Sequence, residues 1–376
     1  MPKIILAANT DWFLYNFRHA LMHELRAQGY EVVFVSPSGK FVSRLQAEGF
    51  RWLPWKLKPH SFAPWKEILS FLHIEQIYRR ERPDIVHHHT IKAVLYGSLA
   101  AALVRVPTVV NTISGRGYVF LGQGWHPRWI RWLIAPFYRY ALRDVSSAVI
   151  FENQADRHFF QKAGFVLPER AHLIEGVGID PQRFVPTPEP DEPILVLMAA
   201  RIHWDKGVGV FVNAARLLHQ RMSIRMVLVG KPEPTNPASI DESTLQAWQR
   251  EGLIECWGWQ RDMETIYPQS HMVVLPTMYG EGVPTTLLEA AACGRPLIAT
   301  DLPGCRAVVK DGQTGILIPP NDPETLAQAI ERLAHNPDLR VRLGNAARDL
   351  VLEKFTRTQI NRATLQVIRL ADATHS

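Results

Sequence analysis

The stretch FVPTPEPDEPILVLMAA, residues 184–200, decides how this chain is organised. Four prolines fall among the eleven residues 184–194, which predicts an extended linker rather than a helix or a strand. The continuously apolar run 194–200 that follows predicts a buried strand. One domain is therefore expected to end before the prolines, and a second domain is expected to begin directly after them.

Apolar strand-like runs alternate with helical patterns on both sides of the linker. The predicted strands are residues 3–8, 31–35, 84–88, 108–111 and 148–151, followed by 194–200, 224–229, 272–275, 296–299 and 315–318. Such alternation is typical of an α/β protein with parallel sheets covered on both faces. We predict two Rossmann-like domains, residues 1–185 and 186–355, whose parallel sheets face each other across a cleft.

Composition excludes several classes of protein. The chain has 376 residues, of which 47% are apolar, so it is not disordered, and its length suits two domains. Cys256, Cys293 and Cys305 form no CxxC pair, which excludes a disulfide scaffold or a zinc ribbon. No apolar run reaches the roughly 18 residues of a membrane span. We expect a cytoplasmic protein, unless it binds a membrane from outside.

The first loop, NTDWFLYN at residues 9–16, contains no glycine. The dinucleotide fingerprint GxGxxG is therefore absent, and the P-loop pattern is absent as well, which argues against a dehydrogenase or a P-loop ATPase. Charge is uneven along the chain: residues 1–185 carry 23 basic and 14 acidic residues, whereas the remainder carries 19 and 22. The excess of nine positive charges predicts an anionic partner for the first domain.

The segment YGEGVPTTLLEAAACGRPLIAT, residues 279–300, is the strongest local signal for a site. Pro284 is expected in the first turn of a helix, where the backbone N–H groups of Thr285 and Thr286 would suit an anion. Glu281 would face the cleft, and Glu289 could accept hydrogen bonds from ribose hydroxyls. The alternative is an ordinary capped helix with two solvated glutamates.

A second signal is AARIHWDKGVGVF, residues 199–211, in which Arg201 and Lys206 flank a loop between a strand and a helix. Ligands of open α/β sheets bind at this edge, and these two cations could hold a diphosphate. The alternative is a pair of surface cations. No Asp-x-Asp pattern indicates a magnesium site, and consecutive strand residues His87–His89 point to alternating faces, so we expect no metal.

Aromatic and basic residues are interleaved at 51–66 and at 125–143. Basic helices that carry tryptophan often lie on an anionic membrane surface, but helices that pack their aromatic side into a core share this pattern. The sequence leaves both interpretations open. No nucleic-acid-binding motif is present, so we expect no nucleic-acid partner.

Taken together, these motifs resemble the retaining glycosyltransferases of family 4, which have the GT-B fold of two Rossmann-like domains. The matching features are Glu281 and Glu289 in an E-x7-E pattern, Arg201 and Lys206 in an R-x4-K pattern, and Gly230 after the second strand of the second domain. PDIVHHH at 83–89 and GVGIDPQRF at 176–184 also correspond to family segments. ARIHWDKGV, ISGRGYVF and EGVPTTLLEAAACGRPLI are similar to a bacterial branch that acts on polyprenyl-diphosphate-linked saccharides.

The resemblance implies a nucleotide-sugar donor, usually a UDP-sugar, no cofactor, and a lipid-linked saccharide acceptor at the inner face of the cell membrane. It makes the first domain the acceptor and membrane domain and the second the donor domain, and it implies that a C-terminal helix, residues 356–376, packs back on the first domain. The implied catalytic residues are Glu281, Arg201 and Lys206. Donor binding would use Arg201, Lys206, Gly230, Trp259, Val283, Thr285, Thr286 and Glu289, and acceptor contacts would come from Asp11, Arg18 and Arg116.

One segment departs from the family pattern. Many members carry a donor-contacting histidine after the strand that corresponds to residues 108–111, where this chain has Ser114 and Gly115. A glycosyltransferase with a soluble acceptor, a UDP-sugar epimerase of the same fold and a non-catalytic binding protein are the alternative functions.

Overall fold

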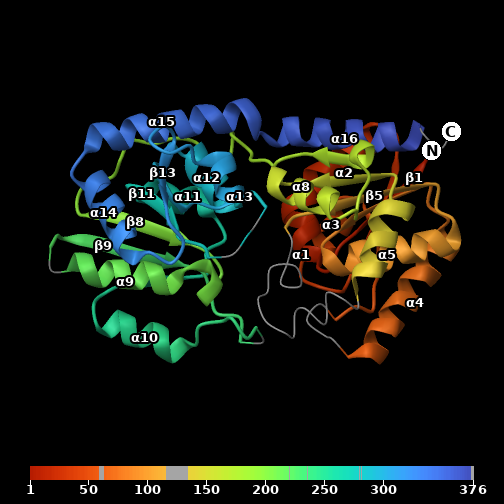
Figure 1. Cartoon of the computed structure of the whole chain (residues 1–376), viewed down its shortest axis with the longest axis horizontal. Coiled ribbons are helices and arrows are strands. Elements are labelled where there is room, and N and C mark those ends of the chain that lie inside the picture. The colour runs from red at the N-terminus through yellow and green to blue at the C-terminus, as the bar shows by residue number, and fades with distance from the viewer. Residues whose placement is uncertain are drawn as a thin grey trace. The chain divides into compact units, whose positions relative to one another are not determined.

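A computed structural model describes residues 1–58, 63–115, 134–219, 221–234, 236–278, 280 and 282–373. The chain divides into two units (Figure 1): Met1–Val177 together with Thr358–Ser376, and Gly178–Arg357. The unit boundary lies before the proline-rich stretch predicted to be a linker. That stretch belongs to the second unit, because Arg340 binds both carboxylate oxygens of Glu189 at 2.8–2.9 Å and Arg295 donates to Thr187 and Pro188.

The first unit is built on a parallel sheet of seven strands in the order β3-β2-β1-β4-β5-β6-β7. The strands are β1 (Lys3–Ala7), β2 (Glu31–Ser36), β3 (Arg51–Pro54), β4 (Ile85–His89), β5 (Thr108–Ile113), β6 (Ala148–Phe151) and β7 (Ala171–Leu173). The helices are α1 (Asp11–Phe13), α2 (His19–Ala27), α3 (Val42–Ala47), α4 (Pro64–Glu81), α5 (Ile91–Val104), α8 (Gln154–Lys162) and α16 (Arg357–Ala373), with π-helical segments at Leu14–Arg18 and Tyr140–Val145.

The second unit holds a parallel sheet of six strands in the order β10-β9-β8-β11-β12-β13. These are β8 (Ile194–Ala199), β9 (Ile224–Val229), β10 (Glu255–Gly258), β11 (Met272–Leu275), β12 (Leu297–Thr300) and β13 (Gly315–Ile318). The helices are α9 (Val208–His219), α10 (Glu242–Arg250), α11 (Met263–Ile266), α12 (Thr285–Ala292), α13 (Pro303–Val308), α14 (Pro323–Ala334) and α15 (Pro337–Lys354).

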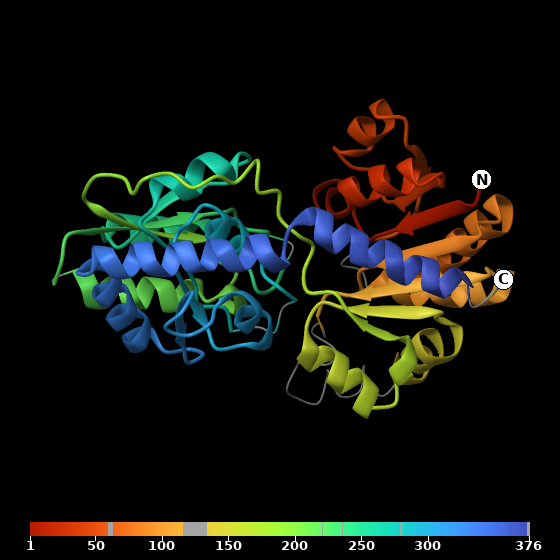
Figure 2. The same cartoon turned by 90° about the horizontal axis from the view of Figure 1, so that it is seen from above.

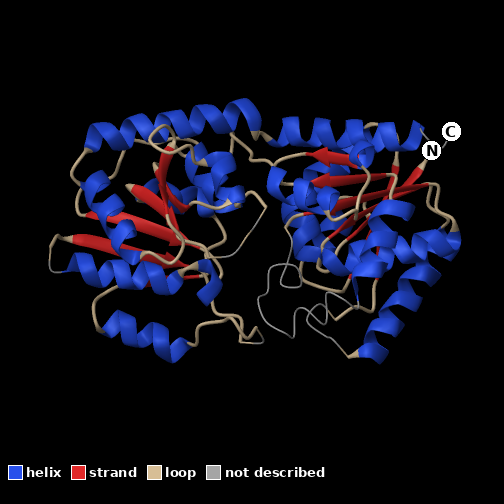
Figure 3. Cartoon of the chain, viewed as in Figure 1, coloured by secondary structure: helices blue, strands red, loops and turns tan. Residues whose placement is uncertain are grey.

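Each sheet is a central layer with helices on both faces (Figures 2 and 3). Successive side chains of β1 explain this arrangement, because they point to opposite faces of the sheet and are buried on both. Ile4 and Leu6 belong to one buried cluster, and Ile5 and Ala7 belong to another. Strands that are apolar on both faces must be covered twice, so the fold is doubly wound as the sequence predicted. Three strands were not predicted, namely β3, β7 and β10, and each is only three or four residues long.

The C-terminal helix α16 closes one face of the first unit. Ile360, Leu365 and Ile368 pack in the same buried cluster as β1 and α2, and Asp372 accepts a hydrogen bond of 3.0 Å from the hydroxyl of Thr108. The core of this unit is therefore completed by residues that are distant in sequence. Among the described residues, no helix combines the length and apolar character needed to cross a membrane.

Candidate functional site

The order of strands in each sheet reverses at one point, and ligands of open α/β sheets bind outside the carboxyl ends of the strands at that point. In the second unit the reversal lies between β8 and β11. The loop after β8 contains Arg201 and Lys206, and α12 begins in the segment that follows β11. The structure thus brings both predicted signals to the same edge of one sheet.

Close backbone approaches hold this edge together. Gly230, directly after β9, has φ of +148°, and an added Cβ would lie 2.0 Å from the carbonyl oxygen of Ala200. Gly207 has φ of +79°, and its added Cβ would lie 1.8 Å from the carbonyl oxygen of Pro276. Only glycine fits at these positions. Gly230 is therefore required by the packing of the loop after β8, whatever it contributes to a ligand.

The two predicted cations lie in different surroundings. The side chain of Arg201 is 55% exposed, and its Nη1 lies 3.8 Å from Oε2 of Glu233. The same carboxylate oxygen lies 3.1 Å from Nε2 of the buried His203. Lys206 ends a short 3₁₀ turn, Trp204–Lys206, and is 8% exposed. The guanidinium of Arg201 is therefore accessible from solvent. The side chain of Lys206, in contrast, is buried within the loop.

Helix α12 begins one residue later than predicted. Pro284 is the N-cap, in an extended conformation, and Thr285 is the first helical residue. The hydroxyl of Thr286 donates to the carbonyl oxygen of Ala199 at 2.9 Å, which fixes the positive end of the helix against the end of β8. The adjacent Val283 is 6% exposed and packs in the core with Leu287.

Glu289 is partly buried on α12, and Tyr267 donates a hydrogen bond of 2.8 Å to its Oε2. Burial raises the pKa of Glu289 to about 7, and this rise is opposed by the Tyr267 hydrogen bond and by the charge of Arg183. Arg183 in turn pairs with Glu264 at 2.8 Å. Glu289 is therefore not the solvated surface glutamate of the alternative interpretation, and its charge changes near neutral pH.

The sequence did not single out the partners of Glu289. Arg183 lies inside the family-like segment at 176–184, which is the signal that could have identified it. Tyr267 gave no sequence signal. Of the other predicted donor contacts, Trp259 follows β10 and is 56% exposed, so its ring is open to a ligand. Glu281 and Arg116 lie outside the described residues.

Asp11 and Arg18, the other predicted acceptor contacts, are both buried at 7% exposure. A carboxylate oxygen of Asp11 accepts a hydrogen bond of 2.7 Å from the backbone N–H of Phe41. Arg18 lies 3.5 Å from Glu152, whose same oxygen accepts a hydrogen bond of 2.9 Å from Ser114. Burial raises the pKa of Glu152, and the guanidinium of Arg18 opposes that rise. These contacts favour a supporting role for both residues, because their polar groups already bind protein.

The three consecutive histidines are core residues. His87 and His89 lie with ring centroids 4.0 Å apart, and Arg18 donates to Nδ1 of His89 at 3.2 Å. His88, between them in sequence, instead contacts Tyr78 and Asn111, at 2.9 and 2.8 Å. Burial lowers the pKa of His88 to about 4 and holds the pKa values of His87 and His89 well below the usual range. The alternation of faces is as predicted, and the three side chains do not converge on one point.

Comparison with known proteins gives matches over both units. Residues 3–153 match the family model described as glycosyl transferase 4-like, and residues 193–336 match the model described as glycosyl transferases group 1. The N,N'-diacetylbacillosaminyl-diphospho-undecaprenol alpha-1,3-N-acetylgalactosaminyltransferase of Campylobacter jejuni is 25% identical over 350 residues, covering 89% of this chain and 90% of that protein.

A second relative is the UDP-Gal:alpha-D-GlcNAc-diphosphoundecaprenol alpha-1,3-galactosyltransferase of Escherichia coli, 27% identical over 76% of this chain and 75% of its own. Among solved structures, Anabaena HepE in complex with UDP-glucose superposes with a TM-score of 0.77 at 18% identity, covering 98% of this chain and all of that one. The two doubly wound parallel sheets and the family matches over both units support the same family. The chain belongs to the GT-B-fold glycosyltransferases, with a glycosyltransferase 4-like domain followed by a group 1 domain.

Proposed function

We propose that this protein is a retaining glycosyltransferase that moves a sugar from a UDP-sugar to a polyprenyl-diphosphate-linked saccharide in the biosynthesis of a surface glycan. The observation that carries the proposal is that the loop with Arg201 and Lys206 and the start of α12, the helix that also carries Glu289, lie at the same carboxyl edge of the second sheet. Two relatives with names that specify undecaprenol-diphosphate saccharides support the class of acceptor.

In the proposed complex the donor diphosphate binds Arg201 and Lys206, and the ribose hydroxyls donate to Glu289. The cations stabilise the negative charge that grows on the departing diphosphate, so the reaction requires no metal ion. An acceptor hydroxyl attacks the anomeric carbon from the face on which the diphosphate leaves. The bond from that carbon to the diphosphate oxygen breaks, and the hydroxyl proton passes to the leaving oxygen. Glu281 positions the hydroxyls of the transferred sugar.

We further propose that the first unit docks on the anionic inner leaflet through a surface on α4. Trp65, Ile68, Leu69 and Leu72 are 51–61% exposed there. Together with Lys56, Lys58 and Lys66, three of these side chains line a hollow of about 450 Å³. An apolar patch rimmed by lysines suits a surface of anionic lipid.

The other tryptophans of the stretch at 51–66 do not belong to this surface. Trp55 is 2% exposed, and Trp52 packs against the core cluster around β1. The core-packing interpretation therefore applies to these two residues. Residues 125–133 of the second stretch, at 125–143, lie outside the described residues.

The function is tested by incubating the protein with a panel of UDP-, GDP- and dTDP-sugars, with and without short polyprenyl-diphosphate saccharides. We expect release of UDP from one UDP-sugar only when the lipid acceptor is present, with the anomeric configuration of the donor retained in the product by NMR. Release without lipid indicates a soluble acceptor or hydrolysis. Conversion of the nucleotide sugar alone indicates an epimerase, and UDP binding without turnover indicates a binding protein.

Arg201→Ala is expected to lower kcat by about 100- to 1,000-fold, because it removes a donor of transition-state charge stabilisation. Since the side chain is 55% exposed, its loss should leave the melting temperature unchanged. Glu281→Gln should lower turnover by a similar factor. Arg250→Ala, an exposed arginine at the end of α10, is the matched control and should keep full activity. Near-normal turnover of either site variant would remove that residue from the mechanism.

Affinity for a UDP-sugar is expected to rise as pH increases through about 7, the raised pKa of Glu289. The ionised carboxylate accepts hydrogen bonds from both ribose hydroxyls, whereas its protonated form accepts them less well. A UDP-sugar is a suitable probe because its diphosphate does not titrate in this range, and calorimetry gives the affinity. Glu289→Gln should bind more weakly and lose the pH dependence. A dependence that is identical in the variant would show that another group titrates.

Leu69→Ser is expected to reduce binding to vesicles that contain anionic phosphatidylglycerol at least about tenfold, because a side chain that enters the bilayer contributes about 1.5–3 kcal/mol. Wild-type binding should weaken as salt is added. Leu370→Ser is the matched control, since Leu370 is 54% exposed on α16 of the same unit and Leu69 is 57% exposed. Equal vesicle flotation of the two variants would contradict a docking surface on α4.

A further inference from the structure

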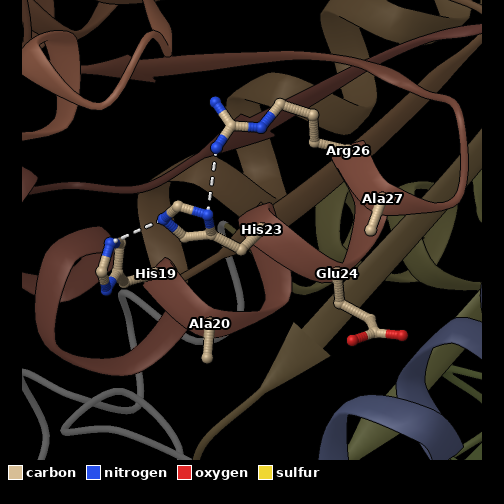
Figure 4. A pocket seen from close by; sticks show the side chains of 6 residues that line it. All are labelled: His19, Ala20, His23, Glu24, Arg26 and Ala27. Carbon is tan, nitrogen blue, oxygen red and sulfur yellow. Dashed lines mark hydrogen bonds between the residues drawn. The ribbon is translucent and has the colours of Figure 1, made fainter.

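Two histidines and a glutamate meet on the surface of the first unit, and none of them has a role in the proposed transfer reaction. Nε2 of His19 lies 2.5 Å from Oε2 of Glu48, and Nε2 of His23 lies 2.7 Å from the same oxygen. The two Nε2 atoms are 3.1 Å apart (Figure 4). The three side chains are 32–41% exposed, so a small ion can reach them from solvent.

The local fold aims these groups at one another. His19 and His23 are four residues apart on α2, which places them on the same face of the helix. Glu48 directly follows α3, which packs with α2 in one buried cluster. The ring of His19 stacks on Tyr15 with centroids 5.4 Å apart, and the ring of His23 meets Phe50 edge-on at 4.9 Å. Both imidazoles are therefore oriented before any ligand binds.

Hydrogen bonds alone do not match the donors and acceptors of these three side chains well. Arg26 donates to Nδ1 of His23 at 3.1 Å, so a neutral His23 carries its proton on Nε2. That proton and one from His19 would both be directed at a single oxygen of Glu48. The two Nε2 atoms would then both be donors, so their contact would form no hydrogen bond. One cation in place of the two protons would bind all three electron-pair donors at once.

We propose that His19, His23 and Glu48 form a binding site for a divalent transition metal, of which Zn²⁺ is the best match. Two imidazole nitrogens and one carboxylate oxygen are ligands that Zn²⁺ commonly uses, and histidines at positions i and i+4 are the helical spacing found in zinc sites. Ligands about 2.0–2.1 Å from a tetrahedral ion lie about 3.3 Å apart, so rotations that separate these atoms by less than about 1 Å suffice. Water completes the coordination on the exposed side.

Binding requires one rearrangement. Nε2 of His23 must offer its electron pair, so its proton moves to Nδ1 and the guanidinium of Arg26 turns away from that nitrogen. Arg26 is exposed, so water can replace its hydrogen bond to His23 and, where the guanidinium turns further, the one of 2.7 Å that it donates to the backbone carbonyl oxygen of Glu48. The bound ion would join α2 to the end of α3 across the surface of the core that both helices cover.

The test is a Zn²⁺ titration of the full chain by calorimetry after treatment with a chelator, together with thermal unfolding with and without Zn²⁺. We expect the wild-type protein to bind one equivalent more tightly than His23→Gln or Glu48→Gln, each of which should weaken that equivalent at least about tenfold. Glu24→Gln is the matched control: its carboxylate lines the same hollow but points away from both imidazoles (Figure 4). It should bind Zn²⁺ as the wild-type protein does.

Zn²⁺ should raise the unfolding temperature of the wild-type protein and of Glu24→Gln more than that of the two ligand variants, because an ion that binds only the folded state stabilises it. Co²⁺ in the same site should give visible absorption without a thiolate charge-transfer band, which separates the site from any metal bound at Cys256, Cys293 or Cys305. Zn²⁺ affinity and thermal shift that are unchanged in both His23→Gln and Glu48→Gln would overturn the proposal.

Discussion

The close contact between backbone segments at the carboxyl end of β8 is the constraint on which the candidate donor site depends. The carbonyl oxygen of Ala199 accepts the hydroxyl of Thr286, and the next carbonyl, of Ala200, lies against Gly230. These contacts bring the starts of three loops, which follow different strands, to one edge. A side chain at Gly230 would separate β8 from β9 there. The tight packing of the backbone therefore holds these loops at one edge of the sheet.

That packing also explains why Glu289 differs from an ordinary helical glutamate. Its position on α12 is fixed by the contact of Thr286 with β8, and the side chain is consequently held beside Tyr267. Burial disfavours the charged form, and the hydrogen bond from Tyr267 and the charge of Arg183 offset only part of that cost, so the pKa rises to about 7. The folded protein is therefore destabilised by ionisation of Glu289 as pH rises from about 4.5 to about 7. Ribose hydroxyls that donate to the carboxylate would relieve this cost, so ionisation and donor binding should favour each other.

Sequence patterns were sufficient for the doubly wound fold because continuous apolar runs leave no other way to bury both faces of a strand. They failed at β3, an edge strand in a stretch rich in aromatic and basic residues. Its first residue, Arg51, and its last, Pro54, are not typical of a strand, so no apolar run marks it. They also predicted an interdomain linker at 184–194, but gave no sign that Arg295 and Arg340, more than a hundred residues later, bind that stretch to the second unit. Long-range ion pairs of this kind leave no local periodicity. The same limit applies at the site: the loop cations were visible as a motif, whereas Tyr267 was not.

The two units place their polar residues differently. In the first unit Arg18, Glu152 and His89 lie at the carboxyl edge of the sheet, but they are buried and Arg18 binds both of the others. In the second unit Arg201 and Trp259 at the equivalent edge are more than half exposed. A buried polar network of this kind is costly to break, although Nδ1 of His87 and Nε2 of His89 have no hydrogen-bond partner beside it. Exposed charge can still exchange water for a ligand. The second unit therefore offers exposed side chains at the edge where ligands of open α/β sheets bind, whereas the corresponding polar groups of the first unit are buried.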